Sequence, residues 1–155
     1  MGAPLYSAVT GGAVALSAAT AKTILGVKAH ANSGLLVKEA FVSFDGVTAS
    51  AVPALIELCY CTFASNSPGT NSTSVTPAQL SGRVLTAGFT AGKTWTTEPT
   101  TITVLKEILI HPSAGMIYQI PLGDEPDTAL GEGLVIRVTA PAVVNVRGTM
   151  VVQRI

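Results

Sequence analysis

Four of the nine carboxylates in this 155-residue chain gather in one short stretch, GDEPDTALGEG at residues 123–133. Three roles suit such a stretch: a calcium loop, a general acid/base pair, or a polar connection between two strands. An EF-hand calcium loop places acids at alternate positions around a central Gly, with a Glu at the twelfth position. Here Asp124 and Glu125 are adjacent and Pro126 follows them, so that pattern is absent. A calcium site of another design stays open.

A pair of carboxylates that hydrolyses a glycan needs a cleft around the sugar. Aromatic side chains, which would line such a cleft, make up only 5% of the sequence. We therefore interpret residues 123–133 as a loop that is solvated or faces a partner. Three of its acids are candidate partner contacts: Asp124, Glu125 and Asp127.

Support for catalysis is also weak elsewhere in the chain. The two histidines, His30 and His111, stand at the ends of predicted strands, and neither a G-x-S-x-G elbow nor a phosphate-binding Gly-rich motif is present. Glu57 shares a predicted strand face with Leu55 and Cys59, and we interpret that face as turned to solvent or to a partner. We predict that the chain is not an enzyme, has no catalytic residues and uses no cofactor.

The two cysteines lie in LCYCTF, at positions 59 and 61. Residues two apart on a strand point to the same face, with Cβ atoms too far apart for an unstrained disulfide. We predict that Cys59 and Cys61 are small buried apolar residues of a protein made in a reducing compartment. A lone C-x-C pattern does not supply the four ligands of a zinc site, so no metal site is predicted.

The composition indicates contact with other protein. Only 12% of the residues are charged, against about 25% in a typical soluble domain. A surface with so little charge tends to associate. The nine basic residues are scattered singly, so direct nucleic-acid binding has no electrostatic basis, and neither a polybasic nor a long apolar segment indicates a membrane.

Short runs rich in Val, Ile, Leu and Thr, separated by Gly, Pro and Ser, predict an all-β fold of about eight antiparallel strands. The eight ranges are 22–30, 35–45, 54–63, 83–90, 102–111, 116–122, 134–140 and 143–154, and 13–18 is a weaker ninth strand. Thr76, Pro77 and Gly82 are placed as in a capped helix, which predicts one short helical turn at 76–82. We favour a jelly-roll β-sandwich over residues 13–155, with an immunoglobulin-type sandwich as the alternative.

Two further features are candidate partner contacts. Residues 1–12 are Gly- and Ala-rich and uncharged, so we expect an extended arm that orders only on a partner, with Leu5 and Tyr6 as its anchors. The only Trp, Trp95, stands in the connection AGKTWTTEP. A Trp in a loop either plugs the end of a sandwich or anchors a partner.

Three long segments together resemble known proteins. They are VSFDGVTASAVPALIELCYCTFASNSPGTNSTSVTPAQLSGR, KTWTTEPT and IYQIPLGDEPDTALGEGLVIRVTAPAVVNVRGTM. In composition and order, these segments resemble small jelly-roll capsid decoration (cement) proteins of tailed bacteriophages that infect actinobacteria. That resemblance implies a homo-oligomer, a trimer above all, which braces the major capsid protein on the outside of the head. It brings no catalytic residues with it.

The first hypothesis is therefore a virion structural protein, a decoration or minor capsid protein made in the host cytoplasm. The alternative is a tail or receptor-binding β-module that binds host-surface glycan in a cleft near Trp95, Tyr118 or Tyr60. A glycan hydrolase with a carboxylate from Glu57 or from the acidic stretch is the third.

Overall fold

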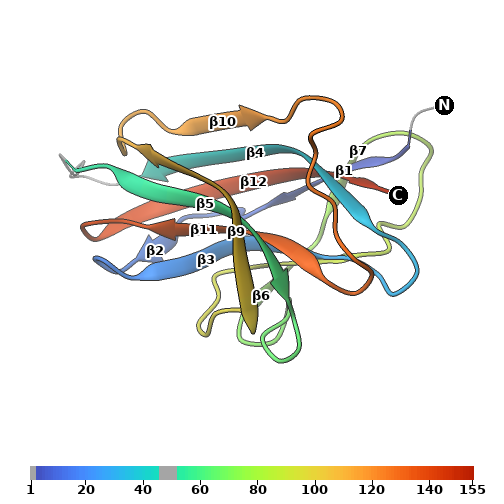
Figure 1. Cartoon of the computed structure of the whole chain (residues 1–155), viewed down its shortest axis with the longest axis horizontal. Helices are drawn as coiled ribbons and strands as arrows, with labels where there is room; N and C mark the ends of the chain where they lie inside the picture. Colours follow the sequence, from blue (N-terminus) through green and yellow to red (C-terminus); the bar gives the residue numbers. More distant parts are fainter. Residues whose placement is uncertain (1–2, 46–51) are drawn as a thin grey trace.

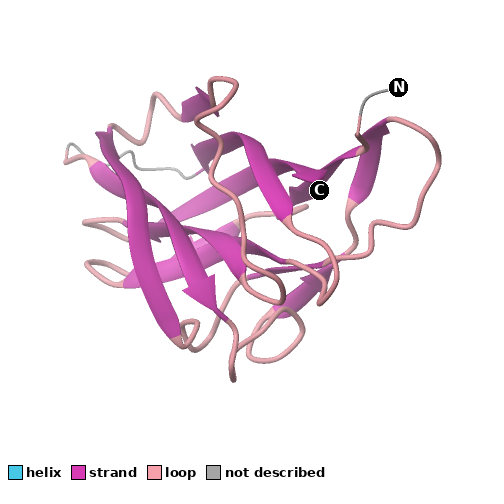
Figure 2. Cartoon of the chain, turned by 45° about the vertical axis from the view of Figure 1, so that its right-hand side comes forward, coloured by secondary structure: helices cyan, strands magenta, loops and turns pink. Residues whose placement is uncertain are grey.

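The computed structural model describes residues 3–45 and 52–155, which form strands and connections and contain no helix (Figures 1 and 2). The strands make two six-stranded sheets. Sheet A contains β1 (Leu5–Val9), β2 (Val14–Leu16), β4 (Leu35–Asp45), β7 (Ala78–Ser81), β10 (Met116–Gln119) and β12 (Val144–Arg154). Sheet B contains β3 (Ala21–Lys28), β5 (Ala54–Thr62), β6 (Thr73–Val75), β8 (Thr90–Lys93), β9 (Thr101–Ile110) and β11 (Gly133–Thr139). The predicted all-β sandwich is confirmed, and no span of membrane-crossing length occurs among the described residues.

The strands pair in the manner of a folded ribbon. β1 pairs with β12, β3 with β11, β4 with β10 and β5 with β9, all antiparallel. β12 also pairs with β4, and β11 pairs with β5, which joins these ribbons into sheets. The resulting order is β10-β4-β12-β1-β7 in sheet A, with β2 on β12, and β6-β8-β3-β11-β5-β9 in sheet B.

Side-chain patterns explain how the two sheets pack. β12 and β4 alternate buried and more exposed residues, which is typical of strands with one covered face. β3, β5 and β11 are buried along most of their length, as continuous apolar runs are when both faces are covered. One face of sheet B packs on sheet A, where the main core includes Leu16, Leu25, Leu35, Leu134, Ile136 and Met150.

The long connection between β5 and β9 contributes strands to both sheets. β7 pairs with β1 in sheet A, whereas β8 pairs with β3 and β6 pairs with β8 in sheet B. The predicted helical turn at 76–82 is therefore wrong, because Ala78–Ser81 form a strand whose partner lies far away in the sequence. The predicted strand at 83–90 is also wrong, because β8 begins only at Thr90 and residues 83–89 are a connection. Every other predicted strand range overlaps an observed strand along most of that strand's length.

The extended arm needs a correction as well. Residues 5–9 form β1, which lies between β12 and β7 inside sheet A, and residues 1–2 lie outside the described part. Tyr6 and Ala8 belong to the main core. The segment was expected to order on a partner because it is rich in small residues, but the chain's own last strand provides its backbone hydrogen bonds.

Candidate protein-contact site

The edge strand β9 carries the largest group of exposed apolar residues on a single strand. β9 pairs with β5, and within the described residues its other edge has no strand beside it. Four of its apolar residues are between 40% and 64% exposed: Val104, Leu105, Ile108 and Leu109. Long apolar edge strands are sites where another chain can pair or pack.

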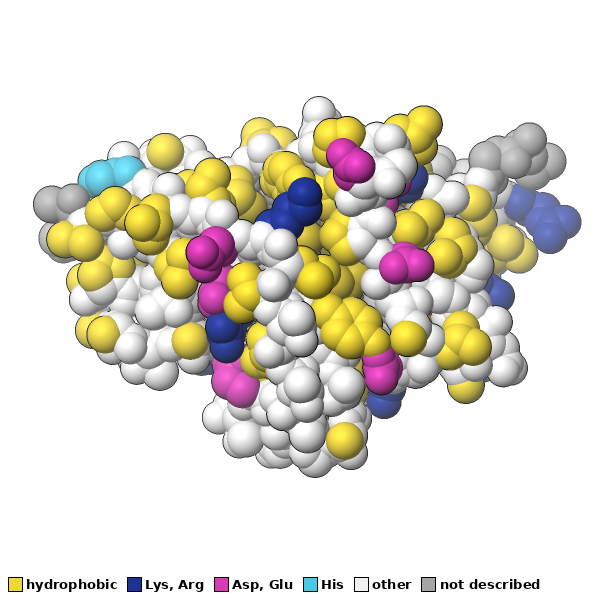
Figure 3. Space-filling model, in the orientation of Figure 1, with side chains coloured by type: hydrophobic (Ala, Val, Ile, Leu, Met, Phe, Trp, Pro, Cys, Tyr) yellow, Lys and Arg dark blue, Asp and Glu magenta, His cyan; other side chains and the backbone are white. Residues whose placement is uncertain are grey.

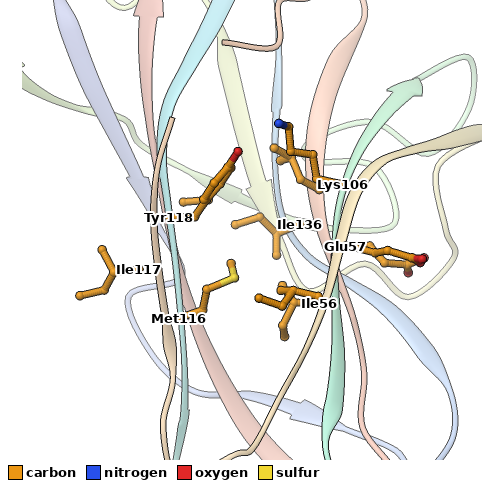
Figure 4. Close-up of a pocket in the computed structure, with 11 residues that line it drawn as sticks. Ile56, Glu57, Lys106, Met116, Ile117, Tyr118 and Ile136 are labelled. Atoms are coloured by element: carbon orange, nitrogen blue, oxygen red, sulfur yellow. The ribbon is translucent and has the colours of Figure 1, made fainter. Parts of the chain in front are cut away.

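An apolar groove separates β9 from β10, the edge strand of sheet A. The groove has a volume of about 240 Å³ and reaches down to Ile56 and Ile136 of the main core. Met116 and Tyr118 of β10 form one wall, and Ile108 of β9 contributes to the other. Figure 4 shows Ile56, Ile136 and Met116 directed into this space, and Figure 3 shows hydrophobic side chains gathered around it. We call this the β9–β10 groove.

Two charged residues of β9 lie at the groove on opposite faces of the strand. Lys106 faces the groove, where its Nζ lies 5.7 Å from the centre of the Tyr118 ring. The Tyr118 side chain also raises the pKa of the Lys106 ammonium above its ordinary value. Glu107 lies beside Glu57 of β5 in the strand register, on the outer face of sheet B. The groove therefore has aliphatic walls and a mixed charged rim.

Glu57 belongs to an ion pair rather than to an open surface. It is only 6% exposed, and Figure 4 shows its side chain turned away from the groove. Arg137 of β11 donates two hydrogen bonds to its carboxylate, from Nε at 2.7 Å and from Nη2 at 3.0 Å. This bidentate bond raises the pKa of the Arg137 guanidinium. The prediction of a solvent- or partner-facing Glu57 was therefore wrong.

A cover lies over the part of the outer face of sheet B that carries Cys59 and Cys61. Trp95 is 1% exposed and stacks on Phe63 at 6.0 Å between ring centres, and its Nε1 donates to the Asn66 carbonyl oxygen at 2.8 Å. Glu98, three residues later, accepts hydrogen bonds from the backbone N–H of Thr23 at 2.8 Å and from its hydroxyl at 2.5 Å. Trp95 is therefore a plug, as one of the two predicted roles had it, and not an accessible partner contact.

Trp95 packs with four other residues in what we call the outer cluster: Cys59, Cys61, Phe63 and Val135. Both cysteines are free and buried, as predicted. Burial raises the pKa of each thiol from 9.0 to about 12. Gly26 and Gly92 leave room for the indole ring, because a Cβ at either position would come within 3.0 Å of Trp95.

The acidic stretch is anchored to the edge of β4. Lys38 Nζ donates to Glu125 Oε1 at 2.6 Å, and this bond, together with backbone N–H groups, lowers the pKa of Glu125. Nearby, Val37 donates its N–H to the Pro126 carbonyl oxygen at 3.0 Å. Asp124 and Asp127 remain exposed, and no group of three potential metal ligands occurs among the described residues. Glu125 thus holds the loop in place, whereas the two aspartates keep their predicted availability to a partner.

The predicted N-terminal anchors are differently placed. Tyr6 is 1% exposed and its hydroxyl donates to the Leu85 carbonyl oxygen at 3.1 Å, so it cannot contact a partner. Leu5 is partly buried and pairs with Gln153 and Ser81 in sheet A. The residues of the β9–β10 groove were not predicted as contacts. The signal that pointed to them was the Lys106–Glu107 pair in the middle of a long apolar strand, which is typical of an edge.

The fold defines the chain as an antiparallel β-protein of two sheets, and comparison with known proteins adds no narrower class. No family model, curated protein or solved structure matches the chain. The case for a function therefore rests on the groove and the surface around it.

Proposed function

We propose that this chain is a virion structural protein, a decoration (cement) or minor capsid protein that stabilises a phage head through protein–protein contacts. The observation that carries the proposal is the β9–β10 groove, which lies over Ile56 and Ile136 of the main core and has the exposed Ile108 in its wall. Covering a groove of this kind removes apolar surface from water, which favours association at about 25 cal/mol per Å². The low charge of the chain is in keeping with such contacts.

The groove suits protein better than glycan. Its walls are aliphatic, and Tyr118 is its only aromatic residue in the described chain. Sugar binding of the kind first considered required an accessible aromatic surface near Trp95, but Trp95 lies under its own loop. The groove therefore favours protein contact over the glycan-binding and glycan-hydrolase hypotheses.

The strand order supports a jelly roll as the fold of this structural protein. A jelly roll forms when a ribbon of four strand pairs folds over on itself into two sheets. Taken in chain order, β1, β3, β4, β5, β9, β10, β11 and β12 pair first with last, second with seventh, third with sixth and fourth with fifth. Of the remaining four strands, β7 extends sheet A beyond β1, β8 and β6 extend sheet B beyond β3, and β2 pairs with β12.

We place the protein on the capsid exterior, with the major capsid protein as a partner and a trimer as the expected oligomer. Because apolar burial is not screened by ions, binding to heads should change little between low and high salt. Neither nucleic acid nor membrane is part of the proposal, since the basic residues are few and scattered.

The test is binding to purified heads of tailed actinobacterial phages that lack the chain, measured by co-sedimentation. The wild type should bind in a fixed ratio to the capsid subunits, and Ile108→Asp, in the wall of the groove, should abolish binding. The matched control is Val143→Asp, which also charges an exposed apolar residue but between β11 and β12, and should bind normally. Wild-type protein that fails to bind any such head contradicts the proposal.

A further inference from the structure

A second apolar feature projects from the molecule at the edge far from the groove. The connection after β7 runs outward at the right of Figures 1 and 2. Within it, Val84 is 91% exposed and Leu85 is also exposed. We call residues 82–86 the projecting loop. β7 and β10 are the opposite edges of sheet A, so the projecting loop and the β9–β10 groove lie on opposite sides of the sandwich.

Hydrogen bonds from within the molecule fix the shape of the projecting loop. The Gln79 side chain donates to the Arg83 carbonyl oxygen at 2.7 Å and accepts from the Leu85 N–H at 3.2 Å. The Tyr6 hydroxyl holds the Leu85 carbonyl from the core side, and Arg154 Nη1 donates to the Thr86 carbonyl oxygen at 3.3 Å. A loop held in this way presents Val84 outward with little ordering cost when it binds.

The loop and the groove match in size and in charge. An apolar cavity of about 150 Å³ admits benzene, so the groove, at about 240 Å³, has room for a short aliphatic tip. Next to that tip, Arg83 has no ion-pair partner among the residues that the structure describes, and the same is true of Glu107 at the rim of the groove. Lys106 lies on the opposite face of β9 and points into the groove, with its Nζ over the Tyr118 ring, so Arg83 must meet Glu107 at the outer rim, away from Lys106.

We propose that the projecting loop of one copy of this chain inserts into the β9–β10 groove of a second copy, with Val84 in the groove and Arg83 beside Glu107. This inference rests on the proposed role of the groove as a protein-contact site. Because loop and groove lie at opposite edges, each copy can give one contact and receive one. Such head-to-tail contacts build closed rings or open filaments, and not simple two-fold dimers.

The strand β9 itself argues against the simplest alternative, a two-fold pairing of two β9 edges. An antiparallel two-fold register centred on the charged pair places Lys106 opposite Lys106, or Glu107 opposite Glu107. Like charges directly opposite each other destabilise a sheet. The charged pair in the middle of β9 therefore disfavours a dimer in these two registers.

The first test is the mass of the purified full chain in solution, by sedimentation equilibrium over a range of concentrations. The wild type should form an assembly larger than a dimer. Val84→Asp should weaken association about ten- to hundredfold, because it places a charge in an apolar groove. Val143→Asp, at another largely exposed valine, should leave association unchanged. A monomeric wild type, or a Val84→Asp variant that associates normally, overturns the proposal.

The second test exchanges the charges. Arg83→Glu and Glu107→Arg should each weaken association about two- to fivefold, and the double variant should recover it, because the pair is then restored with reversed sign. Equal loss in the single and double variants would mean that these residues do not face each other.

The third test links the contact covalently. In a Val84→Cys, Ile108→Cys double variant, mild oxidation should give covalent species above the dimer, whereas either single variant should give none. Cys59 and Cys61 are buried and should add no background. Dimers from Ile108→Cys alone would instead indicate β9–β9 pairing and overturn the proposal.

These results separate from those of head binding. A chain that binds heads but stays monomeric refutes the inserted loop and keeps the proposed function. A chain that assembles through the loop but binds no head keeps the contact and refutes the function.

Discussion

Two parts of sheet B present apolar side chains on the outside of the sandwich core, and the chain covers only one of them. Over β3, β11 and β5, the outer cluster lies beneath Trp95 and the segment around Asn66. On β9, comparable aliphatic residues such as Leu109 have no cover within the described residues. The difference separates what stabilises the monomer from what is free to meet a partner, although both regions have the same local composition.

The largest expected effect is on the covered side. Trp95→Ala removes the residue that packs on Phe63 and both cysteines, so we expect a loss of about 3–5 kcal/mol in the free energy of unfolding. Urea denaturation followed by circular dichroism measures it. Trp95→Phe, which keeps part of the packing, should lose less. A loss below about 1 kcal/mol for Trp95→Ala would mean that the cover contributes little.

The next effect concerns the ion pair under the same cover. Glu57→Gln leaves the Arg137 guanidinium without its charged partner, so we expect a loss of about 3 kcal/mol. The double variant Glu57→Leu, Arg137→Met removes both charges and should lose less than Glu57→Gln alone, because neither charge is then left unpaired. The two denaturation curves, recorded side by side, decide this. A double variant less stable than the single one would speak against the argument.

A third effect, expected to be smaller, is a loss of stability at high pH. Below pH 9, the thiols of Cys59 and Cys61 are protonated in both the folded and the unfolded chain. Their pKa is about 12 when folded, so between pH 9 and 12 only the unfolded thiols ionise and the free energy of unfolding falls. Denaturation across that range checks the slope, with the double Cys→Ala variant as the control. An equally steep fall in the control assigns the effect to other groups.

The smallest effect on stability is expected on the uncovered side. Leu109→Ser should change the free energy of unfolding by no more than about 0.5 kcal/mol, since this side chain is 64% exposed. The corresponding change in the groove wall, Ile108→Ser, should weaken association or head binding, which the sedimentation measurements above record. A large loss of stability in the monomer would show that β9 belongs to the covered class after all.

Local patterns were sufficient to predict the long strands. The ranges that became β4, β5, β9, β11 and β12 carry enough Val, Ile and Leu to identify a strand without knowledge of its partner. β1 and β7 could not be predicted in this way, because LYSAV and AQLS are short and weakly apolar. Their strand structure depends on pairing of β1 with β7 and with β12. Pro77 even favoured a helical turn, which the distant pairing with β1 overrides.

The candidate site was harder to predict for a related reason. Whether a strand lies at the edge of a sheet depends on the order of the strands. The local alternation of apolar and polar residues does not reveal that order. Glu57 shows the same limit from the other side. Its strand face is the outer face of sheet B, but Glu57 is buried there and paired with Arg137, which is 80 positions away in the sequence. What the sequence supplied correctly was the chemistry: two inert cysteines, a loop for the acidic stretch, and a scarcity of charge.

The pairing of β1 with β12 has a consequence for how the protein is made. A ribosome that synthesises about 5–20 residues per second takes on the order of ten seconds to travel from one of these strands to the other. Throughout that time β1 lacks its partner β12, and sheet A is incomplete. Folding during synthesis must therefore stop at partial sheets until β12 emerges. A chaperone that holds the nascent chain during this interval would raise the yield of native protein. The increase would be larger than for a fold in which paired strands are adjacent in sequence.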